Sequence, residues 1–235
     1  MNNPVTPETL RRLAEFDTCT VANAVESFAV RLRNVGFSNS TLSCRMPQMP
    51  AMVGQAVTLR VRSSEPSMKA AFYLDQSDWW ERLDIQPGGP PRVLVIEDVD
   101  SHPGRGALVG SVHACILKAL GCVGVVTNGA VRALETFEDI GLQAFSVGVS
   151  PSHAYGHVVV AGVPVEVAGL RIEPGEIVHG DRHGVVTIPS DLAARLPEVA
   201  GRLRDREKRM CQFCASAGFS TSALRRLIEG DAGRS

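Results

Sequence analysis

Residues 92–129, RVLVIEDVDSHPGRGALVGSVHACILKALGCVGVVTNG, decide the fold of this chain. The segment opens with an apolar run at 92–100 that is typical of a buried strand, and it continues through a glycine-rich loop into an apolar helix. The run VGVVT at 123–127 predicts a second strand, and Asn128–Gly129 predicts a turn after it. A strand, loop, helix, strand order predicts a parallel crossover whose helix start points its N–H groups toward the strand ends. A small anion suits that position.

A lone cation, Arg132, lies just beyond the predicted turn in TNGAVRALETF, residues 127–137. A guanidinium that meets a helix start at the end of a strand indicates a site for a small anion. The glycines of the loop match neither the dinucleotide pattern Gly-x-Gly-x-x-Gly nor a phosphate loop ending in Gly-Lys-Ser/Thr. The sequence therefore argues against nucleotide binding.

Charge is nearly balanced, with 24 Lys plus Arg against 25 Asp plus Glu and a calculated pI of 6.6. This balance gives no electrostatic footprint for nucleic acid or an anionic membrane. The amino-terminal segment lacks the apolar core of a targeting sequence, and no apolar run reaches the roughly 18 residues that a membrane span needs. We expect a cytoplasmic protein with no nucleic-acid or membrane partner, and one domain over the 235 residues, 1–235.

The rest of the sequence predicts strands in the middle of the chain and helices near both of its ends. Thr6 as a cap and Pro7 at the first helical position open the amino-terminal helices, which we expect over about 6–28. A charged helical arm is expected over about 190–230. The remaining predicted segments are a half-buried strand at 52–64, a helix-like stretch at 68–91 that contains Trp79 and Trp80, and short β-rich runs over 157–189. The two tryptophans are expected in the core or in a subunit contact.

Two side-chain groups leave alternatives open. His153 and His157 stand four apart, a spacing that suits either a metal or hydrogen-bonded structural histidines. Asp181 and His183, in GDRHG, are either an acid–base pair or a turn cap.

The cysteines lack the density of a secreted disulfide framework, so we expect free thiols. Cys211 and Cys214 have the spacing of half a zinc site or of a redox motif, but no second pair follows them. The alternative is two side chains on one face of a helix.

Four segments carry a resemblance to a known family, and they lie mostly between residues 92 and 190. These are GALVGSVHACILKALGCVGVV, TNGAVR, GVPVEVAGLRIEPGE and GDRHGVVTIP. The chain resembles the regulator-of-ribonuclease-activity-A-like (RraA-like) family, which includes metal-dependent 4-hydroxy-4-methyl-2-oxoglutarate aldolases. The resemblance implies an α/β sandwich of the swivelling phosphohistidine-domain type with flanking amino- and carboxyl-terminal helices. It also implies a homotrimer or hexamer whose active sites lie between subunits.

The resemblance implies a lyase that cleaves or decarboxylates a pyruvate-type keto acid, such as 4-hydroxy-4-methyl-2-oxoglutarate or oxaloacetate. Arg132 would bind the keto acid and stabilise the enolate oxygen, and Glu207 from a neighbouring subunit's carboxyl-terminal helix would be the acidic partner. The substrate carboxylate would lie on four residues at the helix start, namely Gly110, Ser111, Val112 and His113. The implied cofactor is a divalent metal, Mg²⁺ or Mn²⁺.

The chain departs from the family pattern at Ala133, which stands where the family has the metal-binding Asp. Three interpretations follow: a metal held by other oxygens such as Asn128 or Glu135, a metal-free enzyme of changed chemistry, or a non-catalytic protein. The last has a family precedent in inhibitors of ribonuclease complexes.

Overall fold

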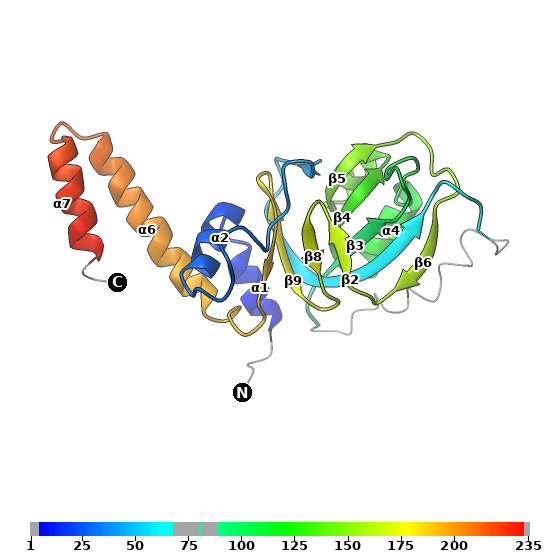
Figure 1. Cartoon of the computed structure of the whole chain (residues 1–235), viewed down its shortest axis with the longest axis horizontal. Helices are drawn as coiled ribbons and strands as arrows, with labels where there is room; N and C mark the ends of the chain where they lie inside the picture. Colours follow the sequence, from blue (N-terminus) through cyan, green and yellow to red (C-terminus); the bar gives the residue numbers. More distant parts are fainter. Residues whose placement is uncertain (1–4, 68–79, 81–88, 233–235) are drawn as a thin grey trace.

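The computed structural model describes residues 5–67, 80 and 89–232. A curled β-sheet forms the body, and helices pack on it and extend from it (Figure 1). The helices are α1 (Pro7–Leu13), α2 (Thr18–Glu26), α4 (Ser111–Ala119), α5 (Leu134–Asp139), α6 (Leu196–Cys214) and α7 (Thr221–Ala232). The strands are β1 (Ser43–Cys44), β2 (Met52–Arg62), β3 (Arg92–Asp98), β4 (Cys122–Val131), β5 (Gln143–Val149), β6 (His157–Ala161), β7 (Val165–Val167), β8 (Leu170–Ile172), β9 (Ile177–Asp181) and β10 (Gly184–Ile188).

Parallel strands form the centre of the sheet. The strand order is β1-β5-β4-β3-β2-β9-β10, and β6 pairs with β2 outside this path. Strand β3 runs parallel to β2 and β4, and β4 runs parallel to β5. Parallel neighbours need crossover connections, and α4 and α5 supply them for the pairs β3/β4 and β4/β5. The predicted strand, loop, helix, strand unit is confirmed.

Both faces of the central strands are covered, which explains why β3 reads as a continuous apolar run. Leu94 and Ile96 belong to the apolar cluster that includes side chains of α4 and α5. Val93 and Val95 point the other way and pack with side chains of the β7–β8 hairpin. Because successive side chains of a strand alternate between faces, one short run supplies both layers. Each fully buried Val or Leu side chain contributes roughly 1.5–3 kcal/mol to stability.

A third apolar cluster fastens the terminal helices to the β9–β10 end of the sheet. Helix α1 starts as predicted, since Thr6 Oγ1 accepts a hydrogen bond from Thr9 N at 3.2 Å and Pro7 takes the first turn. Both α1 and α2 lie within the predicted 6–28. The cluster includes Leu10, Leu13, Val21, Val25, Ile177, Ile188, Leu196 and Ala200.

The carboxyl-terminal arm begins later than the predicted residue 190. Residues 190–195 form turns, and α6 starts at Leu196 because Pro197, which has no N–H to donate, belongs in a first helical turn. No buried side chain follows Ala200 in α6. Arg204 still lies over the Phe16 ring, and beyond these contacts the helix extends from the body and α7 returns beside it (Figure 1). Within the described residues, no helix combines the length and apolar character that crossing a bilayer requires.

The predicted turn at Asn128–Gly129 is wrong, because β4 continues to Val131. Its register with β5 shifts between Thr127 and Ala130. The Asn128 side chain bridges to β3 here: Oδ1 accepts from Asp98 N at 2.7 Å, and Nδ2 donates to Asp98 O at 3.0 Å. The carboxamide thus acts as a peptide group within the sheet, and an Asn-Gly pair that favours a turn forms an irregular strand instead.

Candidate functional site

The start of α4 presents unpaired backbone donors. Gly110 is the residue before the first helical turn, with φ −127° and ψ −163°, and no side chain of the described residues caps the helix there. The first N–H groups of a helix have no acceptor within the helix, so those of Ser111 and Val112 are available to an anion. Both of these residues are exposed. The first turn therefore offers a carboxylate backbone hydrogen bonds and a favourable helix dipole.

Arg132 lies directly against this helix start. Its backbone N donates to Val109 O at 3.2 Å, which joins the end of β4 to the loop before α4. A Cβ atom at Gly110 would lie 2.7 Å from Arg132 Nε, so only glycine fits there without moving the guanidinium. Arg132 Nε is buried and has no hydrogen-bond partner among the described residues. A buried donor costs free energy unless it is satisfied, so Arg132 Nε is available to an acceptor from a ligand, another chain or water.

His113 contributes its backbone to this turn but keeps its ring in the protein interior. The residue is 3% exposed, and its ring centroid lies 5.9 Å from that of Trp80. Burial, and then the positive charge of Arg132, lower the pKa of His113 to about 4. The imidazole is therefore neutral at neutral pH. Trp80 packs against the core as predicted, whereas Trp79 and most of the predicted helix-like stretch lie outside the described residues.

Ala133 follows with a left-handed backbone, φ 56° and ψ 52°. This conformation costs an L-residue roughly 1–2 kcal/mol and is tolerated best by Gly, Asn and Asp. Ala133 thus keeps a turn that suits an aspartate but offers no ligand atom. A hollow of about 390 Å³ opens here, and its lining is Arg132, Ala133, Leu134, Glu135, Val149, Ser150 and Pro151.

The donor set of one chain does not fit a divalent metal. The two polar atoms of the Asn128 carboxamide are engaged by the backbone of Asp98. Glu135 is exposed at the hollow. Over the described part of the chain, no group of three or more His, Cys, Asp or Glu side chains is placed to hold a metal ion. Mg²⁺ and Mn²⁺ prefer several carboxylate oxygens, which this set of side chains does not supply.

Glu207 is not brought to Arg132 within one chain. It lies on α6, where Oε1 accepts from Asn23 Nδ2 at 3.5 Å. In Figure 1, α6 and α4 are at opposite ends of the molecule. The role of Glu207 in a neighbouring subunit's site stays a prediction.

The two histidines that stand four apart bond to local backbone carbonyls. His153 Nδ1 lies 2.7 Å from Ala154 O, and His157 Nδ1 lies 2.8 Å from Tyr155 O. This geometry matches hydrogen-bonded structural histidines. All cysteines are free, as predicted, and Cys211 and Cys214 are exposed on α6.

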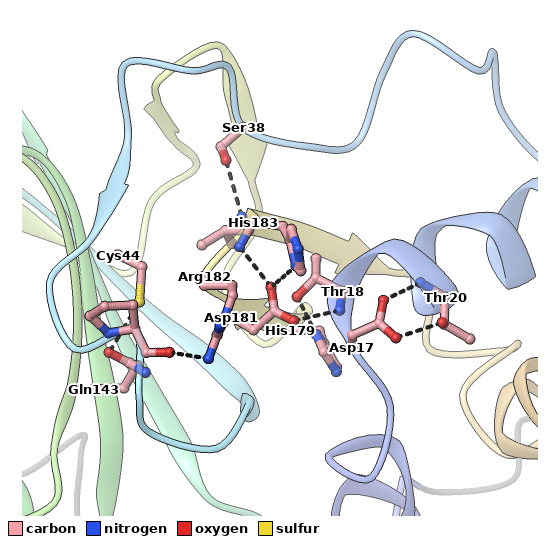
Figure 2. A network of polar contacts seen from close by, with 12 residues as sticks. Asp17, Thr18, Thr20, Ser38, Cys44, Gln143, His179, Asp181, Arg182 and His183 are labelled. Carbon is pink, nitrogen blue, oxygen red and sulfur yellow. Dashed lines mark hydrogen bonds and ion pairs between the residues drawn. The ribbon is translucent and has the colours of Figure 1, made fainter. Parts of the chain in front are cut away.

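Asp181 is both a turn cap and the partner of His183 (Figure 2). Its Oδ1 accepts from His183 N at 2.8 Å and lies 3.0 Å from His183 Nδ1, while Oδ2 accepts from Thr18 N at 3.0 Å. Burial raises the pKa of Asp181, but the hydrogen bonds from His183 and Thr18 outweigh it and lower the pKa overall. The carboxylate therefore fastens the start of α2 to the β9–β10 turn.

A family model described as RraA-like, Aldolase/RraA, matches residues 18–187. The chain belongs to the RraA-like family. The resemblance predicted from the motifs is thereby confirmed.

Curated relatives of this RraA-like chain are distant. Protein DlpA of Legionella pneumophila is 25% identical over 203 residues, which cover 83% of this chain and 29% of that protein. The chain thus spans less than a third of the Legionella protein. A Halalkalibacterium halodurans protein, provisionally named 4-hydroxy-4-methyl-2-oxoglutarate aldolase, is 24% identical over 182 residues, or 75% of this chain and 78% of that protein.

Solved structures share the RraA-like fold. A Pseudomonas syringae pv. tomato protein matches with a TM-score of 0.74 and 21% identity over 96% of both chains. Streptomyces coelicolor RraAS2, described as an unusual member of the RNase ES inhibitor RraA protein family, matches with a TM-score of 0.68 and 21% identity over 89% of this chain and 99% of that chain. At such identity the likeness shows the fold alone, and it confirms the predicted α/β fold with flanking helices.

Proposed function

We propose that this RraA-like chain is a lyase for pyruvate-type 2-oxo acids, of the kind that includes 4-hydroxy-4-methyl-2-oxoglutarate aldolase and oxaloacetate decarboxylase. One observation carries the proposal: the buried, unpartnered Nε of Arg132 lies against the open first turn of α4 at Gly110. A 2-oxo acid offers a carboxylate and a ketone oxygen side by side. The helix N–H groups and the guanidinium are donors of matching chemistry.

The same residues would stabilise the transition state of the reaction. In cleavage of a 4-hydroxy-2-oxo acid, the C3–C4 bond breaks, its electron pair passes to C3, and negative charge develops on the ketone oxygen as pyruvate enolate forms. Arg132 donates to that oxygen and stabilises it more in the transition state than in the ground state. The proton of the C4 hydroxyl leaves as the second carbonyl forms, and a proton from solvent converts the enolate to pyruvate.

A neighbouring copy completes the site in this proposal. Arg132 lines the hollow beside α5, and among the described residues no carboxylate of the same chain forms an ion pair with Arg132. We propose a homotrimer or hexamer in which Glu207 of an adjacent subunit accepts the proton. Relatives named as aldolases support the reaction class at low identity.

A second candidate is a non-catalytic, regulatory member of the family. Ala133 favours it, because the side chain at that position has no oxygen to offer a metal. RraAS2, whose fold this chain shares, is described as belonging to a ribonuclease-inhibitor family.

The decisive experiment is a turnover screen of oxaloacetate and 4-hydroxy-4-methyl-2-oxoglutarate with Mg²⁺, with Mn²⁺ and with chelator. Pyruvate release that Arg132→Lys abolishes supports the lyase. Inertness of both substrates, together with stoichiometric capture of a ribonuclease complex, supports the regulatory protein and rejects the lyase.

A further inference from the structure

A second hollow adjoins the first across the start of α5. Its volume is about 240 Å³. Leu134 and Glu135 line both hollows, so the two hollows meet at the first turn of the helix. The lining of the second hollow, here called the methionine pocket, is Arg45, Met46, Pro47, Gln48, Met49, Leu134, Glu135 and Glu138.

The backbone of the methionine pocket is held in place from three directions. Gln143 Nε2 donates to Met46 O at 3.1 Å, and Arg182 Nη2 donates to Pro47 O at 2.9 Å; Figure 2 shows both donors. Met49 N closes the turn on Met46 O at 3.1 Å. A pocket whose backbone is pre-formed loses little entropy when a ligand enters. Its methionine side chains are the adaptable part, since unbranched thioethers repack around apolar groups.

The charges around the pocket disfavour a second anion. Arg45 directs Nε and Nη2 at Ser146, at 2.7 Å from Oγ and 2.8 Å from the carbonyl oxygen. One edge of its guanidinium is therefore committed to β5, while the group keeps its positive charge. Glu135 and Glu138 also line the pocket and are exposed. With two negative side chains against one positive side chain, the lining disfavours a ligand carboxylate, whereas an aliphatic chain would meet Met46 and Met49.

We infer that the methionine pocket receives the aliphatic chain of a monocarboxylic 2-oxo acid whose carboxylate and ketone are held at Arg132. The inference rests on the proposed function, because it places the head of the same ligand at the same arginine. It adds 2-oxo acids that carry an extended apolar group to the candidate ligands of the proposed site. Leu134 is the divide that such a chain crosses, and Met49 is the residue that selects for its length.

Calorimetry with pyruvate, 2-oxobutanoate, 2-oxopentanoate and 2-oxohexanoate tests the inference. Once the chain passes Leu134, each added methylene raises affinity about fourfold, as burial of one methylene predicts. Met49→Ala lowers the gain in affinity of 2-oxohexanoate over pyruvate and leaves pyruvate affinity unchanged. Met49→Leu, which conserves volume, retains this gain in affinity. Met210→Ala on α6 is the matched control. Thermal melting of each variant checks that it folds.

A second set of titrations compares ligands with apolar tails and ligands with acidic tails. We expect 2-oxoadipate to bind more weakly than 2-oxohexanoate of equal length, and the Glu135→Gln, Glu138→Gln double variant to narrow the difference. Equal affinity along the series, an unchanged gain in Met49→Ala, or tighter binding of 2-oxoadipate overturns the inference and leaves the proposed function standing. Failure of pyruvate and the whole series to bind overturns the proposed function, and this inference with it.

Discussion

At the scale of single residues, Arg132 is where sequence and structure agree most closely. An isolated cation after an apolar run and a helix start with free N–H groups were both visible in the sequence, and the structure brings Arg132 against Gly110. The left-handed backbone of Ala133 was not visible, because alanine carries no preference for that conformation. Arg45 and Met49 were missed as well, since their loop contains no motif and gains its position from distant partners.

Arg132→Lys is expected to lower the affinity for pyruvate or oxalate about tenfold or more. A lysine keeps the charge but loses the planar pair of donors, and hydrogen bonds to a charged group contribute about 1.5–3 kcal/mol each. Isothermal titration measures the change. Arg171→Lys, at the exposed position of β8, is the control. Undiminished binding by the Arg132→Lys variant would assign Arg132 a structural role.

Ala133→Asp is expected to raise Mg²⁺ affinity and to make any lyase activity sensitive to chelator. The aspartate adds a hard oxygen ligand beside Arg132, and the left-handed backbone accepts it without strain. The unmodified protein should bind small carboxylates with little dependence on metal. Titration with Mg²⁺, with and without oxalate, compares the two proteins, and Ala29→Asp, also left-handed with φ 52°, is the control. Equally tight Mg²⁺ binding by the parent would show that other residues already supply the ligands.

At the scale of elements, the central strand, loop, helix, strand unit could be predicted because its apolar periods are long and unambiguous. The end of β4 could not be, since the Asn128 side chain replaces backbone hydrogen bonds that only the neighbouring strand reveals. The start of α6 was misplaced for a similar reason: the charged pattern extends past the point where Pro197 sets the first turn. Asp181 joins α2 to a turn far along the chain, which sequence spacing does not show.

Helix α4 should make stability depend on pH through His113. Its folded pKa is about 4 against an ordinary value of 6.5, so the unfolded chain binds more protons between these values. Stability is therefore fully present above pH 6.5 and is lost as pH falls toward 4, by about 3 kcal/mol. Burial lowers the pKa of His179 too, which adds a loss of the same sign.

Urea unfolding between pH 4 and 7 measures this dependence. His113→Phe, which fills a similar volume beside Trp80, should flatten the acid side of the curve relative to the parent. His102→Gln, on an exposed loop, should leave it unchanged. Superimposable curves for the parent and His113→Phe would contradict the assignment.

At the scale of the whole molecule, the fold could be predicted from the family motifs, whereas the arm's direction could not. Helices α6 and α7 extend from the body, and Phe219 and Ile228 on this arm are 44% and 42% exposed. Contacts with a neighbouring copy depend on the surfaces of both chains. They produce no hydrophobic periodicity that can be recognised in the sequence. That residues 1–235 form one domain stays a prediction.

The arm carries Glu207, which is proposed to complete the site of a neighbouring subunit. The oligomeric state therefore tests that proposal. We expect a trimer or hexamer by light scattering at micromolar concentration, and a smaller species when the chain ends after Arg204, which keeps the buried start of α6. Thermal melting of the shortened chain confirms that its body remains folded. A parent protein that is a stable monomer would remove Glu207 from the site.

The contact between Gly110 and Arg132 has a use in genetics. A methyl group at position 110 would lie 2.7 Å from Arg132 Nε, so the guanidinium has to shift while the net charge of the chain stays the same. Gly110→Ala is thus expected to misplace the arginine without deleting it. In a cell, it would separate phenotypes that depend on the small-molecule site from those that depend only on the protein's presence as a scaffold.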